Sequence, residues 1–303
     1  MADMVIAGAA VGDALRGFAT RDTPGAMGEV HTDHDDAAVL ITGASRGVGR
    51  ELALGFARQR RQLILVARSE DRLRTVADEA RKAGAPEVAI MAADLSDADD
   101  VARLVERISE LADAGTHIDT LINNAAILVG EPFRAQNSET VRHSIALNCA
   151  APTQLITAVL PGMIARGSGR ILYVASIAGI APLTGMSVYS ATKAYAIRVA
   201  DSLRRELRGT GVTVTTLIPG PIETDMLEDV MRADVGMTAL MPNLDPRDVA
   251  YAAIEGLDGG RHVVVPGLMN AMLYYGTRLA PPVVSDWLAN IRLPWVARRD
   301  TGA

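Results

Sequence analysis

The sequence predicts an α/β fold, a doubly wound parallel sheet with helices on both of its faces. Two observations indicate this class. Short apolar runs alternate with helical patterns from residue 38 onward, which is the order of successive β-α-β units. A glycine-rich turn at residues 42–49 follows the first apolar run, at a strand-to-helix junction. No internal repeat and no low-complexity linker divides the 303 residues, so we expect a single domain.

The elements follow in order along the chain. The apolar runs predicted as strands lie at residues 38–42, 63–67, 88–92, 120–123, 171–175, 212–218 and 262–265. The segments between them are predicted as helices at residues 51–59, 71–83, 98–114 and about 138–165, with a further helix carrying Tyr189 and Lys193 to about residue 209. This core, residues 37–267, is the expected catalytic domain.

Two extensions flank the predicted domain. Residues 1–36 hold seven acidic residues against two arginines, and we expect them to be poorly ordered, with a short helix at most near residues 5–18. Residues 268–303 read as an amphipathic extension that could close the pocket, pack on another subunit or lie on a membrane surface. Burial against protein is preferred over the membrane. The residues that predict this extension are Leu268, Met269, Met272, Leu273, Tyr274, Tyr275, Leu279, Trp287 and Trp295.

Composition excludes several classes of function. A hydrophobic content of 49% indicates a globular chain, and the net charge of −6 lies mostly in the first 36 residues, so no nucleic-acid partner is expected. The single cysteine, Cys149, cannot form an internal disulfide, and no uninterrupted apolar run reaches the roughly 18 residues of a spanning helix. We therefore expect a cytoplasmic protein, and no metal site is predicted.

Tyr189 and Lys193 are four residues apart, which places them one turn apart on the same face of a helix. A lysine ammonium beside a phenol favours the phenolate, so we expect Lys193 to lower a tyrosine pKa that is ordinarily about 10. Ser176 ends the apolar run before that helix and would present its hydroxyl at a strand end. The three side chains together predict acid–base chemistry on a carbonyl or alcohol oxygen.

The turn at residues 42–49 has the spacing G-x-x-x-G-x-G, with Gly43, Gly47 and Gly49. Glycines permit a tight turn and a close approach of backbone to a pyrophosphate, which the following helix N-terminus attracts. In the first β-α-β unit this turn predicts a Rossmann-type dinucleotide site. Arg46 in the turn and Arg68 after the second strand could hold a 2′-phosphate, so NADP(H) is preferred. Glu70 and Asp71 nearby keep NAD(H) as an alternative.

These features together resemble the short-chain dehydrogenase/reductase family, in its G-x-x-x-G-x-G and Y-x-x-x-K branch, over most of residues 38–266. The family's N-N-A-G motif is similar to Asn123, Asn124, Ala125 and Ala126, with alanine in place of the glycine. Its P-G-x-x-x-T motif resembles residues 219–224. The cofactor-binding residues that the resemblance and the turn imply are Gly43, Ser45, Arg46, Gly47, Val48, Gly49, Arg68, Asp94, Leu95, Asn124, Ala125, Ala126, Tyr189, Lys193, Pro219, Gly220, Ile222 and Thr224.

The resemblance implies catalytic roles for four residues. Tyr189 would exchange the proton with the substrate oxygen, Ser176 would hydrogen-bond that oxygen, and Lys193 would lower the tyrosine pKa and bind the nicotinamide ribose. Asn148, in the long helix, would support a proton relay. The resemblance also implies a homodimer or homotetramer.

Apolar residues near the predicted site favour an apolar ketone, aldehyde or secondary alcohol as substrate, with reduction by NADPH as the expected direction. They are Ile177, Ile180, Pro182, Leu183, Met186, Met226, Leu227, Val230, Met231, Met237, Leu240 and Met241. Two alternatives stay open at this point: a dinucleotide-binding regulator without catalysis, and a membrane-associated reductase of lipid metabolism. Retention of the Ser, Tyr, Lys and Asn set favours an enzyme.

Overall fold

The computed structural model describes residues 37–180, 183, 185–223 and 242–279. Four groups of predictions lie outside these residues: the N-terminal extension, the cofactor residue Thr224, the apolar residues from Met226 to Met241, and the last part of the C-terminal extension with its two tryptophans. Pro182 also lies outside them.

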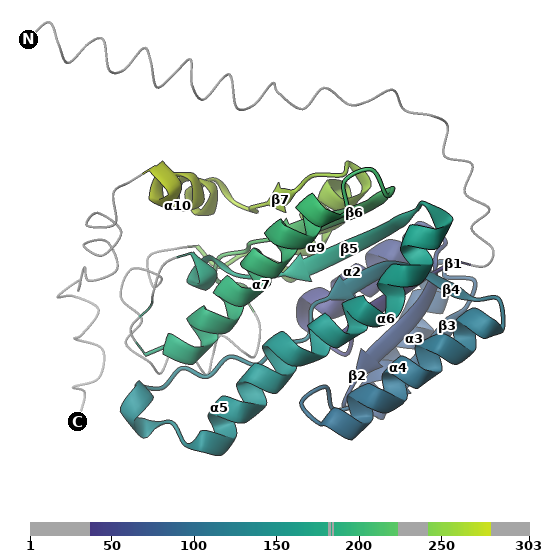
Figure 1. Cartoon of the computed structure of the whole chain (residues 1–303), viewed down its shortest axis with the longest axis horizontal. Helices are drawn as coiled ribbons and strands as arrows, with labels where there is room; N and C mark the ends of the chain where they lie inside the picture. Colours follow the sequence, from purple (N-terminus) through teal and green to yellow (C-terminus); the bar gives the residue numbers. More distant parts are fainter. Residues whose placement is uncertain (1–36, 181–182, 184, 224–241, 280–303) are drawn as a thin grey trace, which may run out of the picture. The chain divides into compact units, whose positions relative to one another are not determined.

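The described part of the chain forms a seven-stranded parallel sheet with the order β3-β2-β1-β4-β5-β6-β7 (Figure 1). The strands are β1 (Ala37–Thr42), β2 (Gln62–Ala67), β3 (Val88–Ala92), β4 (His117–Asn123), β5 (Gly169–Val174), β6 (Val212–Leu217) and β7 (Val263–Val264). Each predicted strand is present, and most bounds agree within one or two residues. β4 begins three residues earlier than predicted, because the polar residues His117 and Asp119 interrupt the apolar run at its start.

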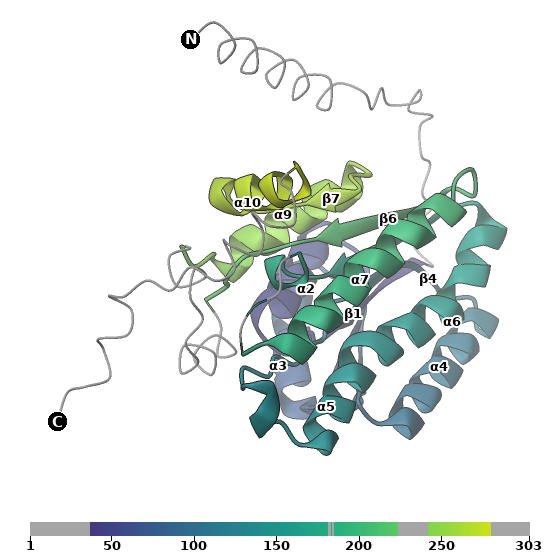
Figure 2. The same cartoon turned by 60° about the vertical axis from the view of Figure 1, so that its left-hand side comes forward.

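Helices cover both faces of the sheet, as the doubly wound class predicts (Figures 1 and 2). One apolar core lies under α2 (Gly47–Arg58), α3 (Glu70–Ala83) and α9 (Pro246–Asp258). The other lies under α4 (Ala98–Asp113), α6 (Ala151–Arg166) and α7 (Ser187–Glu206). Strand β1 supplies both cores, with Val39 and Ile41 on one face and Ala38 and Leu40 on the other. This alternation follows from the two-residue period of a strand.

The long helix predicted near residues 138–165 is interrupted by a π-helical turn. It consists of α5 (Ser138–Ile145), the turn η2 (Ala146–Ala150) and α6. Within the described residues, this segment, Ser138–Arg166, is the one helix long and apolar enough to cross a membrane by length and composition. Its inner residues Leu155, Val159 and Met163 are buried in the core, which accounts for the apolar composition.

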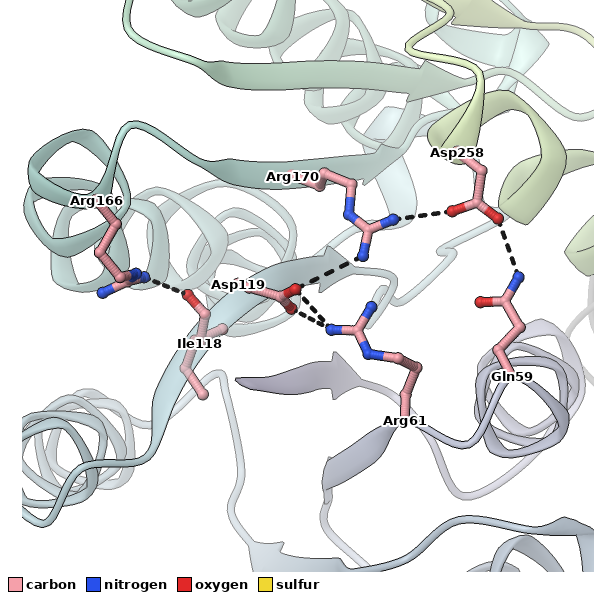
Figure 3. A network of polar contacts seen from close by, with 7 residues as sticks. All are labelled: Gln59, Arg61, Ile118, Asp119, Arg166, Arg170 and Asp258. Atoms are coloured by element: carbon pink, nitrogen blue, oxygen red, sulfur yellow. Dashed lines mark hydrogen bonds and ion pairs between the residues drawn. The ribbon is translucent and has the colours of Figure 1, made fainter. Parts of the chain in front are cut away.

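An ion-pair network joins the amino-terminal ends of the central strands (Figure 3). Arg61, directly before β2, is buried and places Nη2 2.6 Å from both carboxylate oxygens of Asp119. Arg170 in β5 lies 3.6 Å from Asp119 and donates to Asp258 at the end of α9, at 2.8 Å. Gln59 also donates to Asp258, at 2.9 Å. The glycine-rich turn follows the carboxyl end of β1. The network therefore stabilises the opposite end of the sheet.

Helix α10 (Leu268–Leu279) follows β7 at the edge of the sheet, where both views place the two elements side by side (Figures 1 and 2). Tyr274 is 2% exposed and belongs to the core, whereas Leu268 and Met272 are 77% and 65% exposed. The predicted amphipathic helix is thus present in the first third of the C-terminal extension, with its buried face against protein. Helix α9, which received no predicted bounds, begins at an Asp245 cap whose carboxylate accepts the Arg247 amide at 2.7 Å.

Candidate active site

A cavity of about 740 Å³ opens at the carboxyl ends of the strands, where ligands bind in open parallel sheets. It reaches from the glycine-rich turn and the end of β2 to Ser176, Tyr189 and Lys193. Every predicted cofactor-binding residue within the described part of the chain lines this cavity. Asn148 is the one predicted site residue there that lies behind the wall instead.

The glycine-rich turn has the geometry that its spacing predicts. Gly43 has a φ of +67° and Gly47 a φ of +55°, in the left-handed region that favours glycine. A Cβ on Gly49 would lie 2.2 Å from the carbonyl oxygen of Gly43, so the first turn of α2 can pack there only without a side chain. Arg46 is the N-cap residue of α2, and its side chain makes no hydrogen bond to the first amides of the helix. Amides at a helix N-terminus attract an anion.

Asn124 braces this turn from the end of β4. Its Nδ2 donates to the Thr42 carbonyl at 2.8 Å and to the Gly43 carbonyl at 3.3 Å, while its backbone amide donates to the Thr42 hydroxyl at 3.0 Å. The Thr42 hydroxyl donates in turn to the Ile122 carbonyl. Asn124 therefore shapes the turn through its carboxamide in addition to lining the cavity.

The far end of the cavity is rich in cations. Arg46 and Arg68 are both exposed there, and no acidic residue ends β2. Arg72, which was not predicted, also lines the cavity from the first turn of α3. Its place at a helix start, four residues after Arg68, was the available signal. Burial raises the pKa of Asp94, but hydrogen bonds from Ser96 outweigh it and leave that pKa below its usual value.

Ser176, Tyr189 and Lys193 come together at the other end. Ser176 follows β5 and caps the short turn η3 (Ile177–Gly179), where its Oγ accepts the Ala178 amide at 3.1 Å. Tyr189 and Lys193 lie on the buried face of α7 and are 8% and 5% exposed. Gly179 lets η3 approach α7 closely, because a Cβ there would lie 2.6 Å from the Lys193 carbonyl carbon.

The pKa of Tyr189 differs from the expectation. Burial raises the pKa of the phenol to about 12, and a hydrogen bond with Ser176 lowers it only in part. Lys193 directs Nζ to the Val174 carbonyl, 2.9 Å away, and lies 5.7 Å from the centre of the Tyr189 ring. Burial also lowers the pKa of Lys193 to about 8. The prediction that Lys193 brings the tyrosine pKa below its usual value is therefore wrong for this geometry: Ser176 is the residue that lowers it, and burial dominates.

Asn148 sits in the π-helical turn η2, a feature often found at functional sites. Its Oδ1 accepts the Ile127 amide and its Nδ2 donates to the Ile127 carbonyl, each at 2.9 Å. Nδ2 also lies 3.0 Å from the hydroxyl of Thr192, which donates to the Tyr189 carbonyl. Asn148 thus joins the β4 loop to the helix that carries Tyr189.

Pro219 and Gly220 follow β6 and form the part of the wall beside Ser176. The Pro219 carbonyl accepts the Ile177 amide at 3.0 Å, and Pro221 and Glu223 are hydrogen-bonded to Leu244. Apolar side chains also line the cavity. They include the predicted Ile177, Leu183 and Met186, together with Leu128, Leu147 and Pro246, which were not predicted, and Pro221 of the 219–224 motif. Ile180 packs against the core instead.

Comparisons with known proteins agree with this geometry. Residues 37–234 match the short chain dehydrogenase family. The chain is 32% identical to an 11-beta-hydroxysteroid dehydrogenase of Pinus massoniana over 84% of this chain and 73% of that protein. Among solved structures, a short-chain dehydrogenase from Sphingobium yanoikuyae in complex with NADPH is 33% identical, with a TM-score of 0.71 over 85% of this chain and 97% of that one.

A second solved structure is the bulky-bulky ketone specific alcohol dehydrogenase from Comamonas testosteroni. It is 30% identical, with a TM-score of 0.67 over 85% of this chain and 95% of that one. The family match covers more than half of the chain, and its range contains the glycine-rich turn, Ser176, Tyr189 and Lys193. The protein is therefore an oxidoreductase of the short-chain dehydrogenase family.

Proposed function

We propose that the protein reduces an apolar ketone or aldehyde to the alcohol, with NADPH as the hydride donor. The observation that carries this proposal is one continuous cavity with two chemically different ends. Arginines and helix amides gather at one end, and Ser176, Tyr189 and Lys193 at the other. A dinucleotide is the kind of ligand that needs both ends at once.

The residues present fit a dinucleotide. Gly43 and Gly47, with their positive φ angles, form the tight turn before α2, and the amides at a helix N-terminus favour a pyrophosphate. Arg46, Arg68 and Arg72 would bind a 2′-phosphate, and the end of β2 offers no carboxylate for a free ribose 2′-hydroxyl. The NADPH and NADP bound in solved relatives support the same preference.

The protein's own groups supply the proton and the polarisation. The Tyr189 phenol is neutral across the physiological range, because its pKa is about 12, and it can therefore donate a proton to a carbonyl oxygen as that oxygen gains charge. The Ser176 hydroxyl can donate a second hydrogen bond to the same oxygen. When bound, NADPH would supply the hydride. Lys193, charged at pH 7, would lie near the developing negative charge.

The walls favour an apolar substrate. Leu128, Leu147, Leu183 and Met186 line the catalytic end, and Leu128 and Leu183 pack against the cluster that contains Tyr189. Methionine and leucine side chains adapt to apolar groups of different shape. The relatives named for a steroid dehydrogenase activity and for bulky ketones agree with a large apolar carbonyl compound.

A panel of ketones and aldehydes tests the proposal, with NADPH and NADH compared for each by loss of reduced-cofactor absorbance. We expect turnover of apolar ketones with NADPH and little turnover of sugars or charged acids. Cofactor binding without turnover of any compound would reject the reductase proposal.

Arg68→Gln tests the cofactor assignment, with Arg74→Gln as the matched control on the exposed face of α3, where Arg74 pairs with Glu70. We expect Arg68→Gln to raise the KM for NADPH about tenfold or more and to leave that for NADH nearly unchanged. An equal loss for both cofactors would contradict the 2′-phosphate role of Arg68.

A further inference from the structure

The backbone conformation of Gly220 does not require glycine, but the space around this residue does. Its φ angle lies outside the left-handed region. A Cβ at this position would lie 2.3 Å from Oδ1, 2.6 Å from Nδ2 and 2.7 Å from Cγ of Asn270. Heavy atoms do not pack so closely, so the Asn270 side chain occupies the space that any larger residue would need. Since Gly220 lines the cavity, this contact joins α10 to the wall of the site.

Asn270 is held in that place by its own contacts. It is 2% exposed, and its Nδ2 donates to the Pro266 carbonyl at 2.7 Å. Tyr274, one turn later on the same face of α10, is also 2% exposed and belongs to the core. The buried face of α10 therefore presses Asn270 against Gly220, whereas Met272 lies on the exposed face.

Stability alone does not account for an amide at this position. The Oδ1 atom of Asn270 is buried and has no hydrogen-bond partner within the described part of the chain. An unpaired buried acceptor destabilises a fold, and an aliphatic side chain would fill similar space without that cost. The close contact of the Asn270 carboxamide with Gly220 therefore indicates a role for Asn270 other than stability.

The contact reaches the catalytic serine through two residues, Pro219 and Ile177. Pro219, next to Gly220, accepts the Ile177 amide at 3.0 Å, and Ile177 follows Ser176 directly. A shift of the Pro219–Gly220 turn would therefore move both the cofactor wall and the turn that carries the Ser176 hydroxyl.

We propose that Asn270 is a positioning residue, which holds the Pro219–Gly220 turn in the place that dinucleotide binding and the Ser176 geometry require. The inference rests on the proposed function and extends it to the C-terminal helix. Through Asn270, α10 becomes part of the cofactor site, although no α10 side chain that the structure describes lines the cavity.

A double-substitution cycle on the full chain tests this. The variants are Gly220→Ala, Asn270→Gly, both together, and Met272→Ala as the control on the exposed face of α10. NADPH affinity is measured by isothermal titration calorimetry, and KM, kcat and Tm are measured beside it. We expect Gly220→Ala to weaken NADPH binding about tenfold or more and Asn270→Gly about threefold. In the double variant, affinity returns to that of Asn270→Gly, since the added Cβ then has room.

Met272→Ala should leave affinity unchanged, and Asn270→Gly should raise the KM for NADPH by a larger factor than it lowers kcat. Equal losses in Gly220→Ala and in the double variant would overturn the inference. If Gly220→Ala does not fold, Asn270→Gly decides alone, and an unchanged affinity and KM would overturn the inference. If the unsubstituted protein binds neither NADPH nor NADH, the proposed function is rejected as well. If it binds NADPH and the losses of affinity in the two single variants simply add in the double variant, only the role of Asn270 is rejected.

Discussion

Gly179→Ala tests the close packing that brings Ser176 to Tyr189. The added Cβ would lie 2.6 Å from the Lys193 carbonyl carbon, 2.7 Å from its oxygen and 2.8 Å from the Ala194 nitrogen, all backbone atoms of α7. Ordinary contact begins at 3.4 Å, so η3 and α7 must separate by about 0.8 Å. Overpacking of this kind destabilises a protein by about 1–3 kcal/mol.

The same displacement acts on catalysis, because η3 carries Ser176 and α7 carries Tyr189. A misplacement of about 1 Å can reduce a rate by up to about 100-fold, so we expect kcat to fall roughly 10- to 100-fold. A destabilisation of about 2 kcal/mol should lower Tm by about 4–8 °C for a domain of this size. The assay is steady-state reduction of the best ketone of the panel at a temperature well below Tm, with thermal unfolding followed by circular dichroism.

Gly276→Ala is the matched control. Gly276 lies in α10, and a Cβ at this position would meet no atom of the described residues within 4 Å, so alanine there should raise stability by up to about 1 kcal/mol and leave kcat unchanged. Native kcat and native Tm in Gly179→Ala would refute the packing argument. A loss of Tm with native kcat would show that Ser176 does not depend on this contact.

Three further predictions follow from charge and burial. Because the Tyr189 phenol has a pKa of about 12, kcat/KM for alcohol oxidation should rise about tenfold per pH unit between about pH 5 and 7, where Lys193 stays charged, while that for reduction stays nearly flat; a flat oxidation profile would contradict a phenolate base. Burial lowers the pKa of Lys193 from 10.5 to about 8, so between these values the unfolded chain binds more protons and native stability rises with pH. Lys193→Met should therefore unfold at higher urea concentration than the native chain at pH 7, and the difference should shrink toward pH 10.5; a constant difference would contradict the assignment. Asp119→Ala leaves the buried Arg61 guanidinium without its nearest carboxylate and should destabilise the fold by about 3–5 kcal/mol, with little change of kcat per folded molecule, since the network lies at the opposite end of the sheet; a lost kcat at native Tm would contradict this.

Much of the fold follows from local patterns. Strand β1 shows why: its apolar run is buried on both faces, as a central parallel strand requires, and the turn after it has glycine at the two positions with positive φ. Ser176, Tyr189 and Lys193 could be found for the same reason, since the strand end and the helical four-residue spacing fix their places.

The remaining features depend on contacts between distant residues. Residues 146–150 contain alanine and leucine, which favour an ordinary helix, and the π-helical turn there reflects the hydrogen bonds of Asn148 to Ile127. The direction of the Lys193 side chain depends on the Val174 carbonyl in another element. Asn270 and Gly220 meet only through the packing of α10 on the sheet edge, which no local pattern indicates.

Tyr189→Phe tests the central claim most directly, because it removes one hydroxyl and keeps the buried ring. With NADPH and the best apolar ketone of the panel, we expect single-turnover oxidation of NADPH to slow by at least about 100-fold. The affinity for NADPH, measured by calorimetry, should stay nearly unchanged. A variant that retains a near-native rate would contradict the assignment of Tyr189 as the proton donor and, with it, the proposed chemistry of the site.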